Sequence, residues 1–172
     1  PPPPLLFFDS RLKKCAVAPS GAEPCWELAN PDMTDIPEDF LKENADLTGT
    51  LKVEVAVKTI RKHAFYKTKL TGLDLSGAAS LESITDFAFS QTDITGTLVI
   101  PAKVEHIGFG VFYITKITGL ELSNAASLVS IGTNAFRSTD ITGTIVTPFN
   151  VPTYRTGGRG ASFPRGVTIV KA

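Results

Sequence analysis

The chain has 172 residues, 42% of them hydrophobic, so it is long enough to bury the core of one globular domain and is not a disordered chain. Its 17 basic and 17 acidic side chains cancel, which removes any overall attraction to nucleic acid. No apolar run reaches the roughly 18 residues that a spanning helix needs, so no transmembrane segment is predicted.

The first 35 residues are predicted to form a proline-rich arm and an N-terminal cap. Four prolines at positions 1–4 favour an extended polyproline II segment, and the missing initial Met indicates a processed or trimmed start. Cys15 and Cys25 lie ten residues apart, without a CxxC motif or a nearby His. This spacing favours a structural disulfide over free thiols, and both over a metal or redox site. A disulfide would place the protein outside the cytosol.

The next segment is acidic and is predicted to contain a short helix. Positions 21–49 hold eight acidic side chains and one basic side chain, Lys42. Pro37 is suited to the first turn of a helix, and Asp35 is suited to the N-cap. We therefore expect a capping helix over residues 38–44, with its acidic side chains near the positive end of the helix dipole.

A repeat dominates residues 36–154. SITDFAFSQTDITGTLVIP at 83–101 and SIGTNAFRSTDITGTIVTP at 130–148 share twelve of nineteen positions. LTGT at Leu47 and ITGT at Ile94 and Ile141 recur at one constant interval. Within each interval, an Ile followed by a Phe five positions later recurs at roughly 23–24 residues, a period typical of a solenoid in which each unit is one coil. Four clear units and a degenerate one at each end are predicted.

Each unit contains two short extended segments. One is LDL, LVI, LEL or IVT, in which alternation turns the outer side chains inward and the middle one outward. The other precedes a tight turn that carries Ala-Phe or Val-Phe. Stacked coils would place Leu on Leu and Phe on Phe, and each buried large side chain would contribute roughly 1.5–3 kcal/mol. The glycines at 72, 96, 119 and 143 recur before the strands, which indicates tight turns or close coil packing rather than a phosphate loop.

The last segment, residues 155–172, is predicted to be a basic loop followed by a capping strand. Positions 141–172 hold four basic side chains and no acid. The strand is expected at 167–170, where it would cover the final coil. The loop is a candidate contact arm with four members: Tyr154, Arg155, Arg159 and Arg165. Phe163 beside them would allow base stacking, but the balanced charge argues against a nucleic acid role, and none is expected.

The repeat resembles the BspA-like class of leucine-rich repeats. The segments that carry the resemblance are LESITDFAF, LVIPAKVEHIGFGVF and LVSIGTNAF, and the pattern covers about 120 of the 172 residues. Where the family often has Cys after Ala-Phe, this chain has Thr68, Thr92, Thr115 and Thr139. The resemblance implies a mainly β solenoid of the α/β leucine-rich-repeat class, right-handed, with short parallel strands. It also implies protein binding at surfaces and no catalysis.

Candidate chemistry is sparse. His63 and His106 do not occupy equivalent repeat positions, so no shared metal site, cofactor or Ser-His-Asp triad is predicted. The outward positions of the LDL-type strands form the candidate protein-binding face: Lys52, Asp74, Val99, Glu121 and Val146. A flat face of this kind suits a protein partner better than a small molecule.

We therefore predict a non-enzymatic module that binds a protein through this face. The alternative is a structural or accessory subunit, held by its terminal arms in a larger assembly that is membrane-associated or lumenal. The expected location is extracellular or at the cell surface, with an organelle lumen, such as the thylakoid lumen of an alga, as the alternative. The identity of the protein partner is left open.

Overall fold

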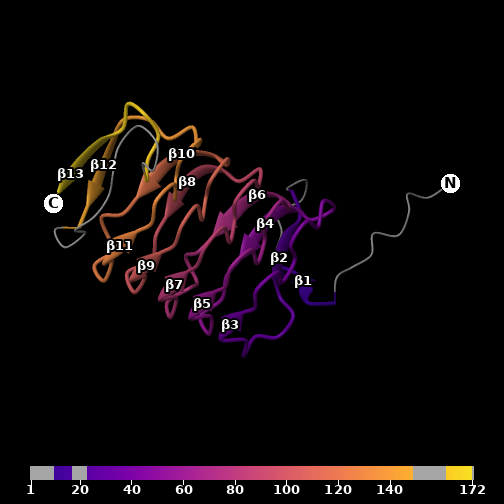
Figure 1. Ribbon diagram of the computed structural model, residues 1–172. Coiled ribbons are helices and arrows are strands. Elements are labelled where there is room, and N and C mark those ends of the chain that lie inside the picture. The colour runs from indigo at the N-terminus through magenta and orange to yellow at the C-terminus, as the bar shows by residue number, and fades with distance from the viewer. Residues whose placement is uncertain (1–9, 17–22, 149–161, 172) are drawn as a thin grey trace.

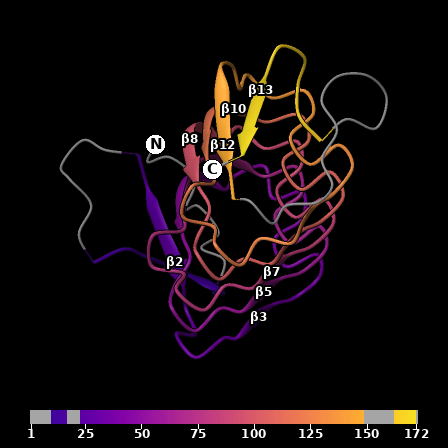
Figure 2. The same cartoon turned by 90° about the vertical axis from the view of Figure 1, so that its left-hand side faces the viewer.

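The computed structural model describes residues 10–16, 23–148 and 162–171, and these wind into a β-solenoid (Figure 1). Within the described ranges there is no helix. Figure 2 looks along the stack and shows the coils enclosing a core, with β8, β10 and β12 on one side and β3, β5 and β7 on another. The predicted leucine-rich-repeat solenoid with short parallel strands is confirmed.

Two rows of strands run along the stack. The first row lies on the candidate face and comprises β4 (Thr48–Lys52), β6 (Lys69–Asp74), β8 (Thr95–Val99), β10 (Lys116–Glu121) and β12 (Thr144–Thr147). The second row is one parallel sheet of two-residue strands: β3 (Asp35–Ile36), β5 (Thr59–Ile60), β7 (Ser83–Ile84), β9 (His106–Ile107) and β11 (Ser130–Ile131). Each coil contributes one strand to each row, as the two extended segments per unit predicted.

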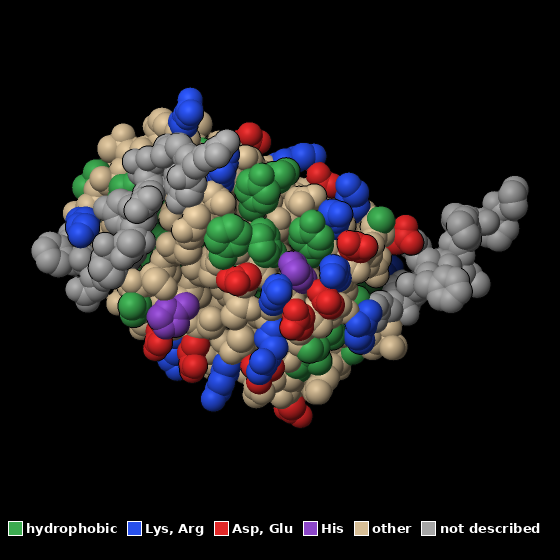
Figure 3. All heavy atoms as spheres, viewed as in Figure 1, with side chains coloured by type: hydrophobic (Ala, Val, Ile, Leu, Met, Phe, Trp, Pro, Cys, Tyr) green, Lys and Arg blue, Asp and Glu red, His purple; other side chains and the backbone are tan. Residues whose placement is uncertain are grey.

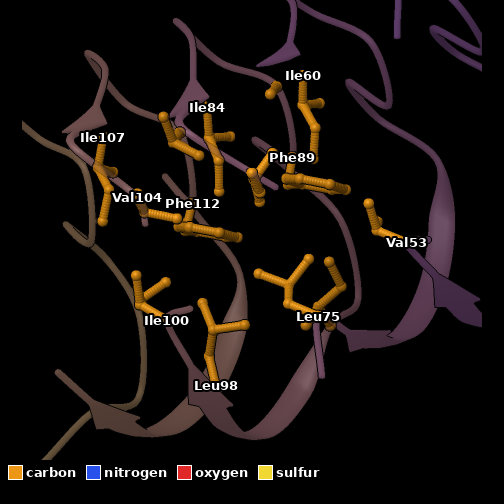
Figure 4. Packing of buried hydrophobic residues seen from close by; sticks show 14 of the residues in the cluster. Val53, Ile60, Leu75, Ile84, Phe89, Leu98, Ile100, Val104, Ile107 and Phe112 are labelled. Atoms are coloured by element: carbon orange, nitrogen blue, oxygen red, sulfur yellow. The ribbon is translucent and has the colours of Figure 1, made fainter. Parts of the chain in front are cut away.

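The core consists of identical side chains stacked from coil to coil. Phe65, Phe89, Phe112, Phe136 and Phe163 form a continuous stack with neighbouring ring centroids 5.2–5.6 Å apart, and all five are fully buried. Figure 4 shows two of these rings, with Ile60, Ile84 and Ile107 aligned beside them. The predicted stacking of Phe on Phe and Leu on Leu is therefore confirmed, and the recurring Ile residues form a further stack beside the rings.

The turn around each Phe has an unusual backbone. Two non-adjacent residues per described turn adopt positive φ, for example Phe87 at 56° and Gln91 at 58°, and only Gly110 among them is a glycine. The alternation aims every second N–H at the next coil: Phe87, Phe89 and Gln91 donate to carbonyls of the following turn at 2.8–3.0 Å. Left-handed conformations cost L-residues roughly 1–2 kcal/mol each, and these inter-coil hydrogen bonds offset that cost.

Four threonines complete these turns where the family often has cysteine. Each is buried, and its hydroxyl donates a hydrogen bond of 2.8–3.0 Å to the carbonyl of the Phe three residues earlier. They are Thr68, Thr92, Thr115 and Thr139. The hydroxyl satisfies a carbonyl inside the core, so the departure from the family pattern is compatible with the fold.

The ITGT motif recurs on every second coil, and the first row alternates with the same period between steps whose strands pair and steps whose strands do not. Leu51 pairs with Leu73, and Leu98 pairs with Leu120. The next steps, from Leu73 to Leu98 and from Leu120 to Ile145, are longer, and no ladder joins β6 to β8 or β10 to β12. The register shifts within both paired steps, which marks a β-bulge. Pairing continues on both sides of each shift, and within the row the strands fall into two pairs, β4 with β6 and β8 with β10.

The recurring glycines serve two different purposes on alternate coils. Gly96 and Gly143 adopt φ of +81° and +82° at the strand entry, a conformation that other residues rarely take. A Cβ on Gly72 would lie 2.4 Å from Thr50 Oγ1, and one on Gly119 would lie 2.6 Å from the hydroxyl oxygen of the neighbouring coil's threonine. Both expected roles, tight turn and close packing, are therefore present.

The predicted helix over residues 38–44 is wrong. The segment is another Phe turn: Asp39 and Glu43 have φ of 56° and 60°, and Phe40 packs edge-on against Phe65 at 6.0 Å. The N–H of Leu41 donates to the next coil at 2.6 Å instead of to its own segment. Asp35 lies in β3 and is not an N-cap. Hydrogen bonds and burial against the second coil outweigh the local helix preference.

Extra strands cover the two ends of the stack. At one end β1 (Leu12–Lys14) pairs antiparallel with β2 (Cys25–Leu28), and the predicted disulfide joins Cys15 to Cys25. At the other end β13 (Thr168–Lys171) pairs in parallel with β12, as expected of the predicted capping strand. A membrane-spanning helix is absent from the part of the chain that the structure describes.

Candidate functional site

The five outward positions of the candidate face occupy successive strands of the first row. Lys52 lies opposite Asp74 in the β4–β6 register, and Val99 lies opposite Glu121 in the β8–β10 register. Val146 lies opposite Val170 of β13. Their neighbours in the strands point into the core, because successive side chains of a strand point to opposite faces: Leu98, Leu120 and Ile145 are buried, and Leu73 is partly buried.

The face changes character along the stack. Its first part carries Lys52 and Asp74, whereas its later part exposes Val99 (46%), Val146 (40%) and Val170 (45%). β-Branched side chains this exposed leave apolar area that a partner can remove from water. Val170 extends this row, but it was not predicted as a face residue, because it lies in the capping strand and follows no repeat.

Asp74 is the most constrained charge on the face. Its Oδ1 accepts a hydrogen bond of 2.9 Å from the backbone N–H of Ser76. Burial opposes its ionisation, but the hydrogen bonds from Ser76 and the charge of Lys52 outweigh burial and lower the pKa of Asp74 below its ordinary value. Asp74 is therefore a fixed carboxylate at neutral pH.

A shallow pocket of about 500 Å³ opens at the ends of β2, β4 and β6. Two predicted face residues, Lys52 and Asp74, line it. The other polar and apolar lining side chains include Glu27, Glu54 and Val55. These three were not predicted, because they lie outside the repeat pattern or at its variable positions. Their proximity depends on the stacking of three successive coils.

A ladder of charges runs along the entry edge of the same strands. Asp93 lies 2.7 Å from Lys116 Nζ on the following coil and 3.8 Å from Lys69 Nζ on the preceding coil. The hydrogen bond from Lys116, with the charges of both lysines, lowers the pKa of Asp93, and Asp93 in turn raises the pKa of Lys116. The pair with Lys69 bridges the longer step that lacks backbone pairing, which gives the ladder a structural role.

Ion pairs between coils also occur away from the face. Arg61 lies 3.3 Å from Asp35, and Lys67 lies 4.0 Å from Glu43 of the preceding coil. Figure 3 shows basic and acidic side chains interspersed over one part of the surface beside a group of hydrophobic side chains. Because Arg61 and Lys67 are paired with carboxylates, their charges are partly neutralised and attract an acidic partner less strongly.

The predicted contact arm falls mostly outside the described residues. Tyr154, Arg155 and Arg159 lie there, and Arg165 is exposed just after the described segment resumes. Phe163, considered as a stacking residue in the sequence, is instead buried in the Phe ladder at 5.5 Å from Phe136. It is the last ring of the core and is unavailable to a nucleic acid base.

Two side-chain groups with potential chemistry were missed because their members lie one coil apart. Glu38, Asp39 and His63 offer ligand atoms within 4.8 Å of one another, a set that suits a divalent metal ion.

His106 Nδ1 lies 2.9 Å from Ser130 Oγ, but the carboxylate of Glu105 lies 3.9 Å from its other nitrogen. That distance is too long for the hydrogen bond that orients a catalytic histidine.

Comparison with known proteins identifies a repeat family. The family model described as BspA type leucine rich repeat region matches residues 34–156 in six copies. No curated protein and no solved structure matches the chain. The six copies agree with the four clear and two degenerate units expected from the repeat.

Proposed function

Because the chain belongs to the family of proteins with a BspA type leucine rich repeat region, we propose that it is a non-enzymatic module that binds a protein through its strand face. Lys52, Asp74, Val99, Glu121 and Val146 are its central contact residues, and Val170 extends the row. The family is one in which repeats commonly serve protein interaction, and it is generally without catalytic activity.

The observation that carries the proposal is the exposure of valines on one face. The solenoid core is complete without Val99, Val146 and Val170, since the ladders beneath them are already buried. Charged groups occupy the first strands of the row and exposed valines predominate at the later ones, and strands of a paired step lie about 4.8 Å apart. A flat surface of this length suits another protein chain, whereas a small ligand needs a deeper cavity.

The disulfide supports a place outside the cytosol. Cys15 and Cys25 are oxidised and join β1 to β2 at the N-terminal end. Such bonds persist in oxidising compartments, and we place the protein outside the cell or at its surface. The alternative of a subunit gripped by its terminal arms depends mainly on segments outside the described residues, so the strand face is the better-supported contact.

The test is to place a charge on the face and the same charge elsewhere. Val99→Lys and Val146→Lys are compared with Val129→Lys, because Val129 is 47% exposed but precedes β11 in the second row. Proteins bound by the wild type in an extract of the source organism are identified by cross-linking mass spectrometry and then purified. We expect a purified partner to bind the two face variants at least tenfold more weakly in calorimetry.

The control variant should bind that partner like the wild type, and all three variants should keep the wild-type melting temperature within a few degrees. Equal binding by all four proteins would remove the strand face as the contact surface. Loss of binding by Val129→Lys alone would move the interface to the second row.

A further inference from the structure

We propose that the pocket at the ends of β2, β4 and β6 receives an arginine or lysine side chain from the bound partner. This inference rests on the proposed function, because the pocket continues the strand face beyond Lys52 and Asp74. It adds a chemical class to the partner: a chain that presents a basic side chain at the N-terminal end of the face.

The charges around the pocket favour a cation. Three carboxylates line it, from Glu27, Glu54 and Asp74, against the single ammonium group of Lys52. Lys13 lies 3.8 Å from the Glu27 carboxylate, so part of that charge is already balanced. The Asp74 carboxylate is held by the Ser76 backbone N–H at 2.9 Å and keeps further acceptor positions for a donor. A guanidinium group meets carboxylates with two parallel hydrogen bonds, which favours arginine.

The apolar lining matches the stem of the same side chains. Val55 is 61% exposed and borders the pocket together with Pro31 and Val53. Arginine and lysine carry an aliphatic stem below a charged head and bury the stem along apolar surface. A purely apolar side chain would leave the carboxylates without a partner. An acidic side chain would be repelled by the excess of carboxylates.

The repeat itself supplies an internal comparison. Val53 N–H donates to the Asp74 carbonyl at 3.0 Å, and at the equivalent place two coils later Ile100 N–H donates to the Glu121 carbonyl at 3.1 Å. The scaffold is thus the same in both units. Yet Glu54 and Val55 are replaced there by Pro101 and Ala102. The solenoid therefore builds this corner without an acid or an exposed valine, so Glu54 and Val55 are not required by the fold.

Peptide titration tests the pocket without knowledge of the natural partner. The probes are the peptides acetyl-GSGRGSG-amide and acetyl-GSGQGSG-amide, added to the isotope-labelled full chain and followed by amide chemical shifts. We expect the arginine peptide to shift the amides of Val53, Glu54, Val55 and Ser76, with millimolar affinity that weakens as salt rises. The glutamine peptide should bind at least tenfold more weakly.

Variants then assign the charges. Glu54→Gln combined with Asp74→Asn should weaken the arginine peptide at least tenfold, because the amides keep the shape and remove the charge. The matched control combines Glu82→Gln with Glu105→Gln, which removes two carboxylates from exposed positions outside the pocket and the strand face, and it should leave peptide binding unchanged.

Equal binding of the two peptides, or shifts confined to other parts of the chain, would overturn the assignment. Concentration-dependent association of the chain that the double variant abolishes would also overturn it, since the occupant would then be a second copy. The proposed function is tested separately: Val99→Lys should lose the partner but still bind the arginine peptide. If the arginine peptide does not bind but Val99→Lys still loses the partner, the pocket assignment is refuted and the proposed function stands.

Discussion

Removal of one ring from the middle of the Phe ladder should destabilise the whole solenoid. Phe112 is fully buried and stacks between Phe89 at 5.6 Å and Phe136 at 5.2 Å. Replacing a buried Phe by Ala costs about 3–5 kcal/mol, and two lost ring pairs place Phe112→Ala in the upper part of that range. A domain of ordinary stability has only about 5–15 kcal/mol in total.

The matched control is Phe109→Ala in the same turn. Phe109 is 38% exposed and makes one edge contact, with Phe87 at 5.0 Å. Its loss should cost about 1 kcal/mol. Urea denaturation measures both values, and the melting temperature of Phe112→Ala should fall by roughly 8–20 °C. A cost for Phe112→Ala no larger than that for Phe109→Ala would refute the view that the stacked rings hold the coils together.

Three further predictions concern the coil contacts. Gly72→Ala should destabilise by about 1–3 kcal/mol because its Cβ would lie 2.4 Å from Thr50 Oγ1, and Thr50→Ala should recover part of the loss in a double-mutant cycle. Ile114→Asn should raise the unfolding free energy by about 0.5–1 kcal/mol, since an exposed Ile at φ 55° is strained and Asn tolerates that conformation; an unchanged urea midpoint would contradict this. Asp93→Asn should lower stability at neutral pH. The pKa of Asp93 is lowered below 3.8 in the folded chain, so the stability deficit of the variant should shrink as the pH falls from 3.8 through this lowered pKa. Asp93 raises the pKa of Lys116 above 10.5, so the deficit should also shrink as the pH rises from 10.5 through this raised pKa. A deficit that is constant from acid to alkaline pH would exclude the ion pair as its cause.

Periodic features were predictable because a solenoid repeats one local solution. The spacing of Ile and Phe predicted the second row of strands and the ring ladder, and the alternation in LDL-type segments predicted which side chains face outward. The spacing of Cys15 and Cys25 favoured a disulfide over free thiols, and the structure confirms the bond. Each of these inferences depends on residues whose partners lie at a fixed distance along the chain.

Predictions failed where local preference competes with neighbouring coils. Residues 38–44 favour a helix by composition but form a Phe turn, since the backbone N–H groups of Asp39, Leu41 and Glu43 reach carbonyls of the next coil. Phe163 follows Phe136 at a longer interval than the one that separates the earlier rings, so its place in the ladder was hidden by the break in period.

Residue type and spacing were enough to predict a six-unit repeat with its inward and outward positions, and they favoured the disulfide over free thiols. Strand pairing is visible only in the folded chain, since the short and long steps of the first row differ in hydrogen bonding rather than in pattern. It also brought Glu27, Glu54 and Asp74 from three coils into one pocket. Their shared surface depends on how coils stack, and stacking is set by the buried ladders on the opposite side of each strand.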